Sequence, residues 1–503
     1  MRNMTGGWRR WAKGAAITLC SALVACGGGG GGGGGNNSGG GVQISPSNAT
    51  VPAGGRLQFT GPSGSTTWSV DNIPGGSLSV GGISGTGLYL APVKVPSANT
   101  VADPQVSAAL TITADGADNA ATVTLVSRFE APSTLNVCAP GPCSAERPNA
   151  VVMADLNSDG RSDIATANVG TGTVSVLQSV AAGSFAAPLR YDVGDAFVSE
   201  PQALAAAYVD GDVVMDLVMA DANFSDPSVS VRLGNGDGTL QAEQKAGLPP
   251  GSDPLSMATG VLMNGDLMRD VVIANFSANS VMVLTGDGSG QLVAPTPILA
   301  GYVDGPLGVA VGDLNHDGLD DVVIANSGVM TGSPGAGLVV GLNAASDPFA
   351  TPGNYPVAGS PSAVALADLN ADGYLDALVT DAAGYTLTVF LNQKTSGSAT
   401  ILLESPAGPI QTGREPIAVA AADINLDGAQ DVVVANRQDN SVTIYFGLND
   451  GTLALAETYR VGAAPQAVAM GDVDADGWFD LAVVNRDDGT VSVLHNRGGA
   501  TTP

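Results

Sequence analysis

The pattern of hydrophobic and polar positions repeats about every fifty residues between 128 and 497. In each repeat a proline opens a run of small apolar residues such as AVVMA. A polar stretch follows, and then come a β-branched run such as DVVIAN and an alternating run such as TVSVL. Turns such as GNGDGTL lead into a further apolar run. Short runs bounded by Gly, Asn and Asp are typical of β-strands. The prolines that mark the repeats are Pro148, Pro201, Pro254, Pro306, Pro361, Pro416 and Pro465.

Seven repeats of four short strands, without helical periodicity, predict an all-β fold, a seven-bladed β-propeller. Small residues in the first run suit strands that crowd around a central axis. The seventh repeat ends at TVSVLHNRGG without a fourth strand, whereas an unassigned segment, RFEAPSTLNV (128–137), precedes the first repeat. We therefore expect 128–137 to be the closing strand of blade seven and 498–503 to form a tail.

Residues 42–126 have a different pattern, with alternating stretches such as RLQFTG and ALTITA and one tryptophan, Trp68. This pattern predicts a small β-sandwich with Trp68 in its core. The stretches TVPAGGRLQF, GLYLAP and ATVTLV resemble bacterial Ig-like domains, and the resemblance implies the role of a spacer. The expected architecture is a seven-bladed β-propeller preceded by a small Ig-like β-sandwich.

The N-terminal segment has the features of an export signal. Basic residues precede an apolar run that is too short to cross a bilayer as a permanent helix. The run ends in LVAC, which resembles a bacterial lipobox; the resemblance implies that 1–25 is a lipoprotein signal peptide and that Cys26 carries a lipid. Residues 26–41 are mostly glycine and predict a flexible tether. We expect a protein that is lipid-anchored in the bacterial envelope. Its resemblance to known sorting signals implies the outer membrane, where the folded part would be either periplasmic or surface-exposed.

The charge balance limits the partners. The chain has 47 Asp and Glu against 19 Lys and Arg, a net charge of -28. Such a surface repels phosphate backbones, which argues against nucleic acid as a partner. A hydrophobic content of 44% argues against disorder. We expect a monomer.

The few cysteines and histidines exclude several kinds of chemistry. Cys138 and Cys143 lie in CAPGPC and are predicted to form a local disulfide in an exported protein. His316 and His495 are too few for a zinc site and are interpreted as solvated side chains. The sequence has neither a G-x-S-x-G elbow nor a Cys-His pairing, so we predict no enzyme activity.

Each repeat carries an acidic loop of nine positions between its first two strands. Intact copies such as DLNHDGLDD have Asp at position one, Asn or Asp at three, Asp at five, Gly at six and Asp at nine. The copies at Tyr208–Asp216 and Leu262–Asp270 lack the first Asp and the glycine, and the second of them holds a one-residue insertion. We number the loops 1 to 7 along the chain. The predicted side-chain ligands are Asp155, Asn157, Asp159 and Asp163 in loop 1; Asp313, Asn315, Asp317 and Asp321 in loop 4; Asp368, Asn370, Asp372 and Asp376 in loop 5; Asp423, Asn425, Asp427 and Asp431 in loop 6; and Asp472, Asp474, Asp476 and Asp480 in loop 7.

Carboxylates this close repel one another unless a hard cation lies among them, and oxygen atoms are the ligands that Ca²⁺ prefers. An EF-hand would need a Glu at position twelve and flanking helices, whereas position twelve here falls inside a strand. Mg²⁺ is the weaker candidate because it demands tighter geometry. The alternative is that these residues only form turns, but five copies with the same Asp at position nine favour structural calcium sites. Backbone carbonyls of position seven complete the predicted cages: Arg161, Leu319, Tyr374, Ala429 and Trp478.

These loops and their proline-marked period resemble the FG-GAP or VCBS repeat family, whose blades occur in integrin α-chain heads and in bacterial surface proteins. The resemblance covers about 128–497 and implies a calcium-stabilised β-propeller. The Phe-Gly portion of the family pattern is poorly kept, which weakens any inference to integrin-like ligands.

Three functions fit these features. The first is an extracytoplasmic binding or adhesion module for a glycan or protein ligand, with the variable stretches 223–228, 326–337 and 436–441 as its surface. The second is a calcium-dependent, lyase-like enzyme acting on polysaccharide; the scarcity of Lys and Arg counts against it. The third is a passive envelope scaffold. We favour the binding module.

Overall fold

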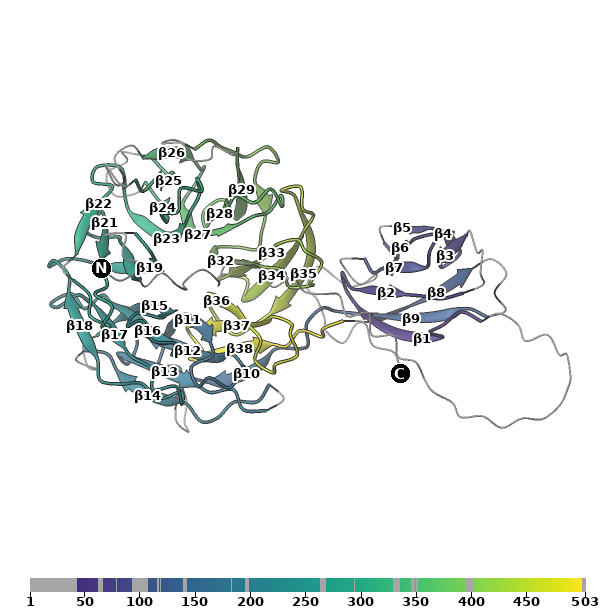
Figure 1. Cartoon of the computed structure of the whole chain (residues 1–503), viewed down its shortest axis with the longest axis horizontal. Helices are drawn as coiled ribbons and strands as arrows, with labels where there is room; N and C mark the ends of the chain where they lie inside the picture. Colours follow the sequence, from purple (N-terminus) through teal and green to yellow (C-terminus); the bar gives the residue numbers. More distant parts are fainter. Residues whose placement is uncertain are drawn as a thin grey trace, which may run out of the picture. The chain divides into compact units, whose positions relative to one another are not determined.

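A computed structural model gives the fold of the chain (Figure 1). The structure describes residues 43–499, except 62–66, 78, 93–106, 115–116, 118, 139–142, 182, 195–198, 263–267, 294, 329–334, 345–348, 350–351 and 394–400. The predicted signal peptide, Cys26 and the glycine-rich tether lie outside these residues. The described part contains strands and no helices, so the all-β prediction is confirmed. It follows that none of the described segments is a helix able to span a membrane.

Two sheets are formed by residues 48–126. The first contains β1 (Asn48–Pro52), β9 (Ala121–Val126), β8 (Ser107–Ala114), β3 (Trp68–Val70) and β4 (Ile73–Pro74), in this order, with β1 parallel to β9. The second contains β2 (Arg56–Gln58), β7 (Leu88–Leu90), β6 (Gly81–Ile83) and β5 (Gly76–Ser77).

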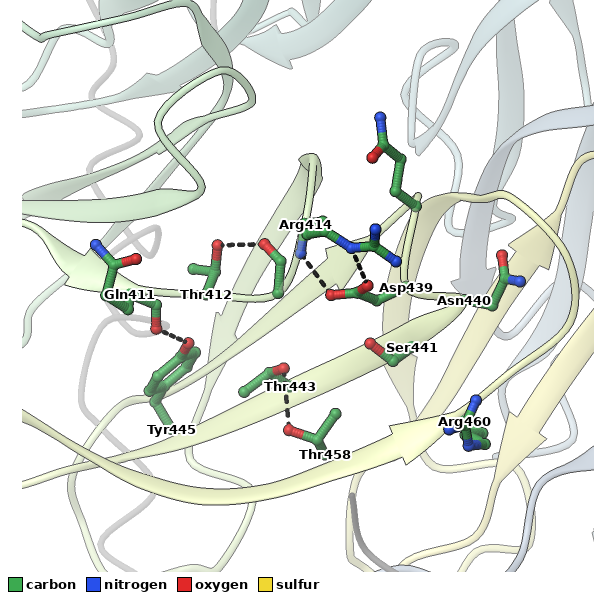
Figure 2. Close-up of a pocket in the computed structure, with 12 residues that line it drawn as sticks. Gln411, Thr412, Arg414, Asp439, Asn440, Ser441, Thr443, Tyr445, Thr458 and Arg460 are labelled. Carbon is green, nitrogen blue, oxygen red and sulfur yellow. Dashed lines mark hydrogen bonds and ion pairs between the residues drawn. The ribbon is translucent and has the colours of Figure 1, made fainter. Parts of the chain in front are cut away.

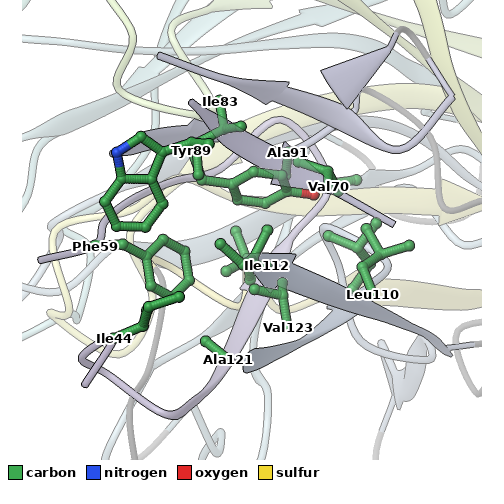
Figure 3. Close-up of a cluster of buried hydrophobic side chains, with 14 residues drawn as sticks. Ile44, Phe59, Val70, Ile83, Tyr89, Ala91, Leu110, Ile112, Ala121 and Val123 are labelled. Carbon is green, nitrogen blue, oxygen red and sulfur yellow. The ribbon is translucent and has the colours of Figure 1, made fainter. Parts of the chain in front are cut away.

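Side chains from both sheets form one hydrophobic core (Figure 3). Alternation along β9 buries Ala121, Val123 and Leu125 and leaves the residues between them more exposed, as expected for a strand with one buried face. Trp68 lies in this core at 5% exposure, with its ring 6.4 Å from that of Phe59. The core thus includes Phe59 from RLQFTG and Leu110 and Ile112 from ALTITA.

Seven further sheets occupy residues 133–494; we number them 1 to 7 by their first strands. Sheets 1 to 3 consist of β11 (Pro148–Ala154), β12 (Asp163–Asn168), β13 (Thr173–Leu177) and β14 (Leu189–Asp192); β15 (Pro201–Ala207), β16 (Asp216–Asp221), β17 (Ser228–Arg232) and β18 (Gln244–Gly247); and β19 (Pro254–Gly260), β20 (Asp270–Asn275), β21 (Ser280–Leu284) and β22 (Thr296–Ile298). Sheets 4 and 5 consist of β23 (Pro306–Gly312), β24 (Asp321–Asn326), β25 (Gly337–Gly341) and β26 (Gly353–Pro356); and β27 (Pro361–Ala367), β28 (Asp376–Asp381), β29 (Thr386–Asn392), β30 (Leu403–Glu404) and β31 (Ile410–Gln411). Sheets 6 and 7 consist of β32 (Pro416–Ala422), β33 (Asp431–Asn436), β34 (Ser441–Gly447) and β35 (Leu453–Arg460); and β36 (Pro465–Gly471), β37 (Asp480–Asn485), β38 (Thr490–Leu494) and β10 (Ser133–Asn136).

The first strands of these sheets contact one another in sequence order. β11 contacts β15, and the same contact continues through β19, β23, β27, β32 and β36, which contacts β11 in turn. In Figure 1 these strands lie around a common centre, with the later strands of each sheet farther out. The arrangement is β-propeller-like.

Burial follows the order of strands within each sheet. Every second strand is fully buried, as in DVVIAN of β20, because both of its faces are covered by neighbouring sheets. Outer strands such as β14 and β18 alternate between half-buried and exposed positions, as expected at the rim. Every first strand begins at one of the predicted prolines, so the proline marks where each sheet starts.

Sheet 7 joins two distant parts of the chain. β10 pairs antiparallel with β38, with Ser133 opposite Val493 and Asn136 opposite Thr490. The segment 128–137 thus contains the outermost strand of a sheet whose other strands come from the end of the chain. Cys138 and Cys143, directly after β10, form a disulfide with their Cα atoms 5.7 Å apart.

Arg128 is fully buried beside this junction. Its Nε and Nη2 donate to the carbonyl of Ala53 at 3.0 and 2.6 Å, and its Nη1 donates to the carbonyl of Gly498 at 2.8 Å. The backbone N–H of Arg128 donates to the Glu457 carboxylate at 2.9 Å, and the guanidinium lies 5.5 Å from the centre of the Trp478 ring. One cation therefore joins three segments that are far apart in the chain.

Candidate metal-binding loops and the opposite face

The intact acidic loops share one network of backbone hydrogen bonds. In loop 1 the Asp155 carboxylate accepts from the N–H groups of Asp159 at 3.0 Å and Gly160 at 2.9 Å. Asn157 accepts from Asp159 at 3.1 Å, and Asp159 accepts from Arg161 at 3.0 Å. The same bonds recur at the same positions in loops 4, 5, 6 and 7. The network turns the oxygens of positions one, three and five toward the inside of the loop.

Two left-handed residues make this turn possible. In loop 1 Ser158 at position four has φ 59° and Gly160 at position six has φ 85°. Glycine occupies position six in all five intact loops, where φ lies between 85° and 90°. A side chain at position six would be strained at these angles, which accounts for the glycine in the sequence pattern.

The aspartate at position nine is buried in all seven loops, including the two degenerate ones. In loop 2, Oδ2 of Asp216 accepts from the Val209 N–H at 2.9 Å and Oδ1 accepts from the Gly234 N–H at 2.9 Å. Equivalent pairs of bonds recur in every loop. This aspartate therefore ties the start of the loop to the end of the third strand whether or not the other acidic positions are present.

The side chain at position two is buried in every loop, and the backbone carbonyl of this residue links neighbouring sheets. Its carbonyl accepts a hydrogen bond from the next sheet in six of the seven loops, as from Asn392 to Leu314 at 2.8 Å and from Asn496 to Ile424 at 3.0 Å. In loop 7 the Val473 carbonyl accepts from Ser179 of sheet 1, so this linkage also joins the last sheet to the first. The other three bonds run from Gly238 to Leu156, from Asn343 to Leu262 and from Gly451 to Leu369.

Leu262 belongs at position two of loop 3, whereas the sequence alignment placed it at position one. Its N–H donates to Asp270 at 2.9 Å and its side chain is 4% exposed, like the position-two residues of the other loops. The predicted insertion therefore follows Leu262; residues 263–267 lie outside the described part. In loop 2 the residue in place of the glycine, Val213, is 88% exposed.

Loop 7 has an additional group, His495, which was predicted from the sequence to be a solvated side chain. His495 is partly buried, and its Nδ1 lies 3.8 Å from Oδ2 of Asp480. The neighbouring Asp480 carboxylate raises the pKa of His495 above its ordinary value. His495, Asp474 and Asp480 offer ligand atoms within 4.8 Å of one another, as do Asp472, Asp474 and Asp476. His316, the second histidine, is exposed and stacks on Tyr374 of the neighbouring loop at 4.1 Å.

The donor set of the intact loops suits a hard divalent cation. It consists of carboxylate and amide oxygens at positions one, three, five and nine; among the described residues, three acidic ligand atoms within 4.8 Å of one another are found in loop 7. Each carboxylate oxygen that accepts one N–H bond keeps a second lone pair. The residues that would hold Ca²⁺ are thus Asp155, Asn157, Asp159 and Asp163 in loop 1, with their equivalents in loops 4 to 7.

Replacing Asp216 by Ala is expected to destabilise the protein by about 2–3 kcal/mol, because two buried backbone N–H groups lose a charged acceptor. The loss should be the same with calcium or with a chelator, since loop 2 lacks the first aspartate and the position-six glycine of the intact loops. Urea unfolding measures it. Asp212→Ala in the same loop is the control: Asp212 is exposed and accepts a single N–H, from Val214, at 2.7 Å. Equal effects of the two substitutions would contradict the role assigned to position nine.

Without metal the protein should become less stable as the pH rises from about 4 to about 7. Burial raises the pKa of Asp163 and Asp376 to about 6 and of Asp321 and Asp431 to about 7, from an ordinary 3.8. The folded chain then binds these protons more tightly than the unfolded chain. Their contribution to the free energy of unfolding is therefore full below pH 3.8 and is lost as the pH rises through 6 to 7. We expect the midpoint of urea unfolding in chelator to fall as the pH rises over this range. In saturating calcium we expect the midpoint to rise with pH, because the ion binds the deprotonated carboxylates. A midpoint in chelator that rises with pH would contradict the prediction.

The other ends of the strands form a second face, which we call the turn face. It consists of the turns between second and third strands and the residues before the first-strand prolines. These segments share one end because Pro148 pairs with Asn168, the last residue of β12. Antiparallel strands place this end opposite the acidic loops. The predicted surface stretches 223–228 and 436–441 lie here; 329–334, within the third stretch, is outside the described residues.

Two adjoining cavities open on the turn face. One, of about 600 Å³, lies between the end of sheet 5 and sheet 6 (Figure 2). The other, of about 500 Å³, lies between sheets 6, 7 and 1. Gln438 and Asn440 line both, and both belong to the stretch 436–441. A third cavity of about 490 Å³ is lined by the beginnings of all seven first strands and shares Arg437, Gln466 and Arg486 with the second.

Comparison with known proteins adds a family match. The model of the FG-GAP-like repeat matches residues 263–324, 368–434 and 423–483, so the chain contains FG-GAP-like repeats. Each match includes at least one of the intact loops 4 to 7. No curated protein matches the chain. Among solved structures, the crystal structure of BBS1N in complex with ARL6DN, soaked with lead, is 14% identical, with a TM-score of 0.46, and the match covers 73% of this chain and 97% of that one.

Proposed function

We propose that this protein is a lipid-anchored binding module of the bacterial envelope, in which a calcium-stabilised, seven-bladed β-propeller presents its turn face to a glycan or protein ligand. FG-GAP-like repeats and a β-propeller-like fold suit a binding or scaffold role. The proposal assigns no catalysis to the loops, because their carboxylates are replicated around the ring and their oxygens accept backbone N–H groups.

The proposed organisation follows the sequence. Residues 1–25 would direct export, Cys26 would carry the lipid, and 26–41 would hold the folded part away from the membrane. Residues 42–126 would form an Ig-like spacer, supported by their two sheets and single core. Residues 128–497 would form the propeller, supported by the ring of contacts between first strands.

Calcium would act on structure in this proposal. Loops 1, 4, 5, 6 and 7 would each hold one ion, and the loops also carry the hydrogen bonds between neighbouring sheets. An ion in a loop would therefore stabilise both its own turn and the contact with the next sheet.

The observation that carries the binding role is the pair of adjoining cavities at 436–441. Their linings come from sheets 5, 6, 7 and 1, and they open at the end of the sheets that is free of acidic loops. Turns of the same face add exposed aromatic rings: Phe224 in sheet 2 is 89% exposed and Tyr385 in sheet 5 is 37% exposed. Exposed aromatic groups on rigidly held turns are typical of recognition surfaces.

The test is capture by full-length protein immobilised in millimolar calcium. Envelope extracts and extracellular polysaccharides are passed over it, and the retained material is identified. We expect a defined ligand that is lost in the Phe224→Ala, Gln438→Ala double variant and kept in Val213→Ala, which changes an exposed residue on the acidic-loop face. Capture that is equal in all three proteins would contradict the assigned face. An empty column would favour the scaffold, and unsaturated products in the flow-through would favour a lyase.

A further inference from the structure

Three arginines from consecutive sheets meet at one cavity of the turn face. Arg437 directly follows β33, Arg486 directly follows β37, and Arg147 directly precedes β11. All three line the cavity of about 500 Å³. Arg437 and Arg486 also line the third cavity, which is surrounded by the seven first strands, so the cluster lies at the edge of that cavity.

Among the described residues one of the three cations of the cluster forms an ion pair, and Asp487 also lines the cavity. Arg437 forms an ion pair with Glu415. For Arg147 and Arg486 no ion pair is found within the described part of the chain. The pKa of Arg486 is lowered by burial and by the charges of Arg147 and Arg437, and raised less by Asp487 and Glu200. Nε of Arg486 and Oε1 of Gln466 are buried without a hydrogen-bond partner among the described residues. Like charges held together with an unused donor favour an anion as ligand.

The neighbouring cavity offers a different set of groups. Figure 2 shows the hydroxyls of Ser441, Thr443 and Thr458 together with Arg414 and Arg460 in its lining. Thr443 and Thr458 lie 3.2 Å apart through their hydroxyl oxygens, and Arg414 forms an ion pair with Asp439 at 2.6 Å. Ser441 and Thr443 are 4% and 3% exposed, and their hydroxyls accept from Nδ2 of Asn436 at 3.3 and 3.0 Å. A hydroxyl that accepts one bond can still donate to a ligand rich in hydroxyls.

We infer that the two cavities together bind an acidic oligosaccharide, with a sugar carboxylate at Arg147 and Arg486 and neutral hydroxyls along Ser441, Thr443 and Thr458. A guanidinium binds a carboxylate through paired N–H donors, which gives both affinity and orientation. The net charge of -28 opposes dense polyanions, so the inference places a single sugar carboxylate at the arginines and uncharged hydroxyls along the rest of the ligand. This inference rests on the proposed binding role of the turn face and names its ligand class.

The test uses full-length protein in excess calcium, titrated calorimetrically with an oligogalacturonate, the matching neutral oligogalactose and an oligoglutamate peptide. We expect the oligogalacturonate to bind at least about tenfold more tightly than the other two, with affinity falling as salt is raised. The Arg147→Gln, Arg486→Gln double variant should lose about tenfold or more in affinity for it. The control Arg269→Gln removes one exposed arginine from the acidic-loop face and should bind as the parent does.

Two outcomes would overturn the inference while leaving the binding module standing. Oligogalacturonate affinity that is equal in the double variant and the control would remove the arginines from the site. Preferred binding of oligoglutamate, lost in the double variant, would replace the saccharide by an acidic peptide. Absence of binding to all three probes also overturns the inference, and the capture experiment with Phe224 and Gln438 then decides the proposed function separately. Unchanged melting temperatures in the variants show that they are folded.

Discussion

Removing calcium with a chelator is expected to lower the melting temperature of the protein by more than about 10 °C. An ion present at a hundredfold its Kd stabilises the folded state by about 2.7 kcal/mol per site, or about 13 kcal/mol for five independent sites. The effect is large because the loops hold both the turns and the bonds between sheets. Buried carboxylates that repel one another without the ion add to it.

Scanning calorimetry in calcium, in magnesium and in chelator measures this effect. Magnesium should restore less than half of the shift, since Mg²⁺ demands near-octahedral geometry and gives up its waters reluctantly. Asp313→Asn should reduce the calcium-dependent part by about one site's share, whereas Asp212→Asn in loop 2 should leave it unchanged. A melting temperature that chelator does not move would remove calcium from the structure.

Replacing Arg128 by Met is expected to destabilise the protein by about 3–5 kcal/mol, because the substitution leaves buried partners without their cation. The carbonyls of Ala53 and Gly498 would each lose a donor. The Glu457 carboxylate, 3% exposed, would lose the nearby positive charge. Methionine fills much of the volume, so the loss reports on charge and hydrogen bonding.

The matched control is Arg190→Met. Arg190 also pairs with a glutamate, Glu146, at 3.0 Å, but its side chain is 33% exposed. Its removal should cost about 1 kcal/mol or less. Urea unfolding of the two variants in calcium compares them directly. An Arg128→Met midpoint equal to that of the parent would mean that the buried arginine joins the segments without stabilising them.

Local chemistry explains what the sequence predicted well. A proline at the start of each first strand and an aspartate at the start of each second strand mark strand ends, because proline lacks an N–H donor and the aspartate accepts two backbone N–H groups. Loop position six was also readable, since only glycine takes its φ without strain. These features depend on neighbours in the chain and therefore leave a periodic signature.

Features that depend on distant contacts left no such signature. Arg147, Arg437 and Arg486 meet only because the ring brings sheets 6, 7 and 1 together, so a count of arginines suggested a surface poor in cations. His495 was interpreted as solvated because Asp480 is fifteen residues earlier, across a hairpin. The linking role of position two was missed since a buried leucine or valine has an ordinary apolar pattern, and its carbonyl is invisible in sequence.

The pairing of β10 with β38 has a consequence for the order in which the protein is assembled. Its two strands are about 360 residues apart in the chain, as for Ser133 and Val493. During synthesis β10 is made long before β38, the strand that it pairs with. The edge of β10 therefore stays unpaired until β38 is available. The ring of sheets cannot be completed until β38 (Thr490–Leu494) has been made. A closing contact of such long range makes the last step slow, and an interrupted chain would expose strand edges to neighbours or proteases.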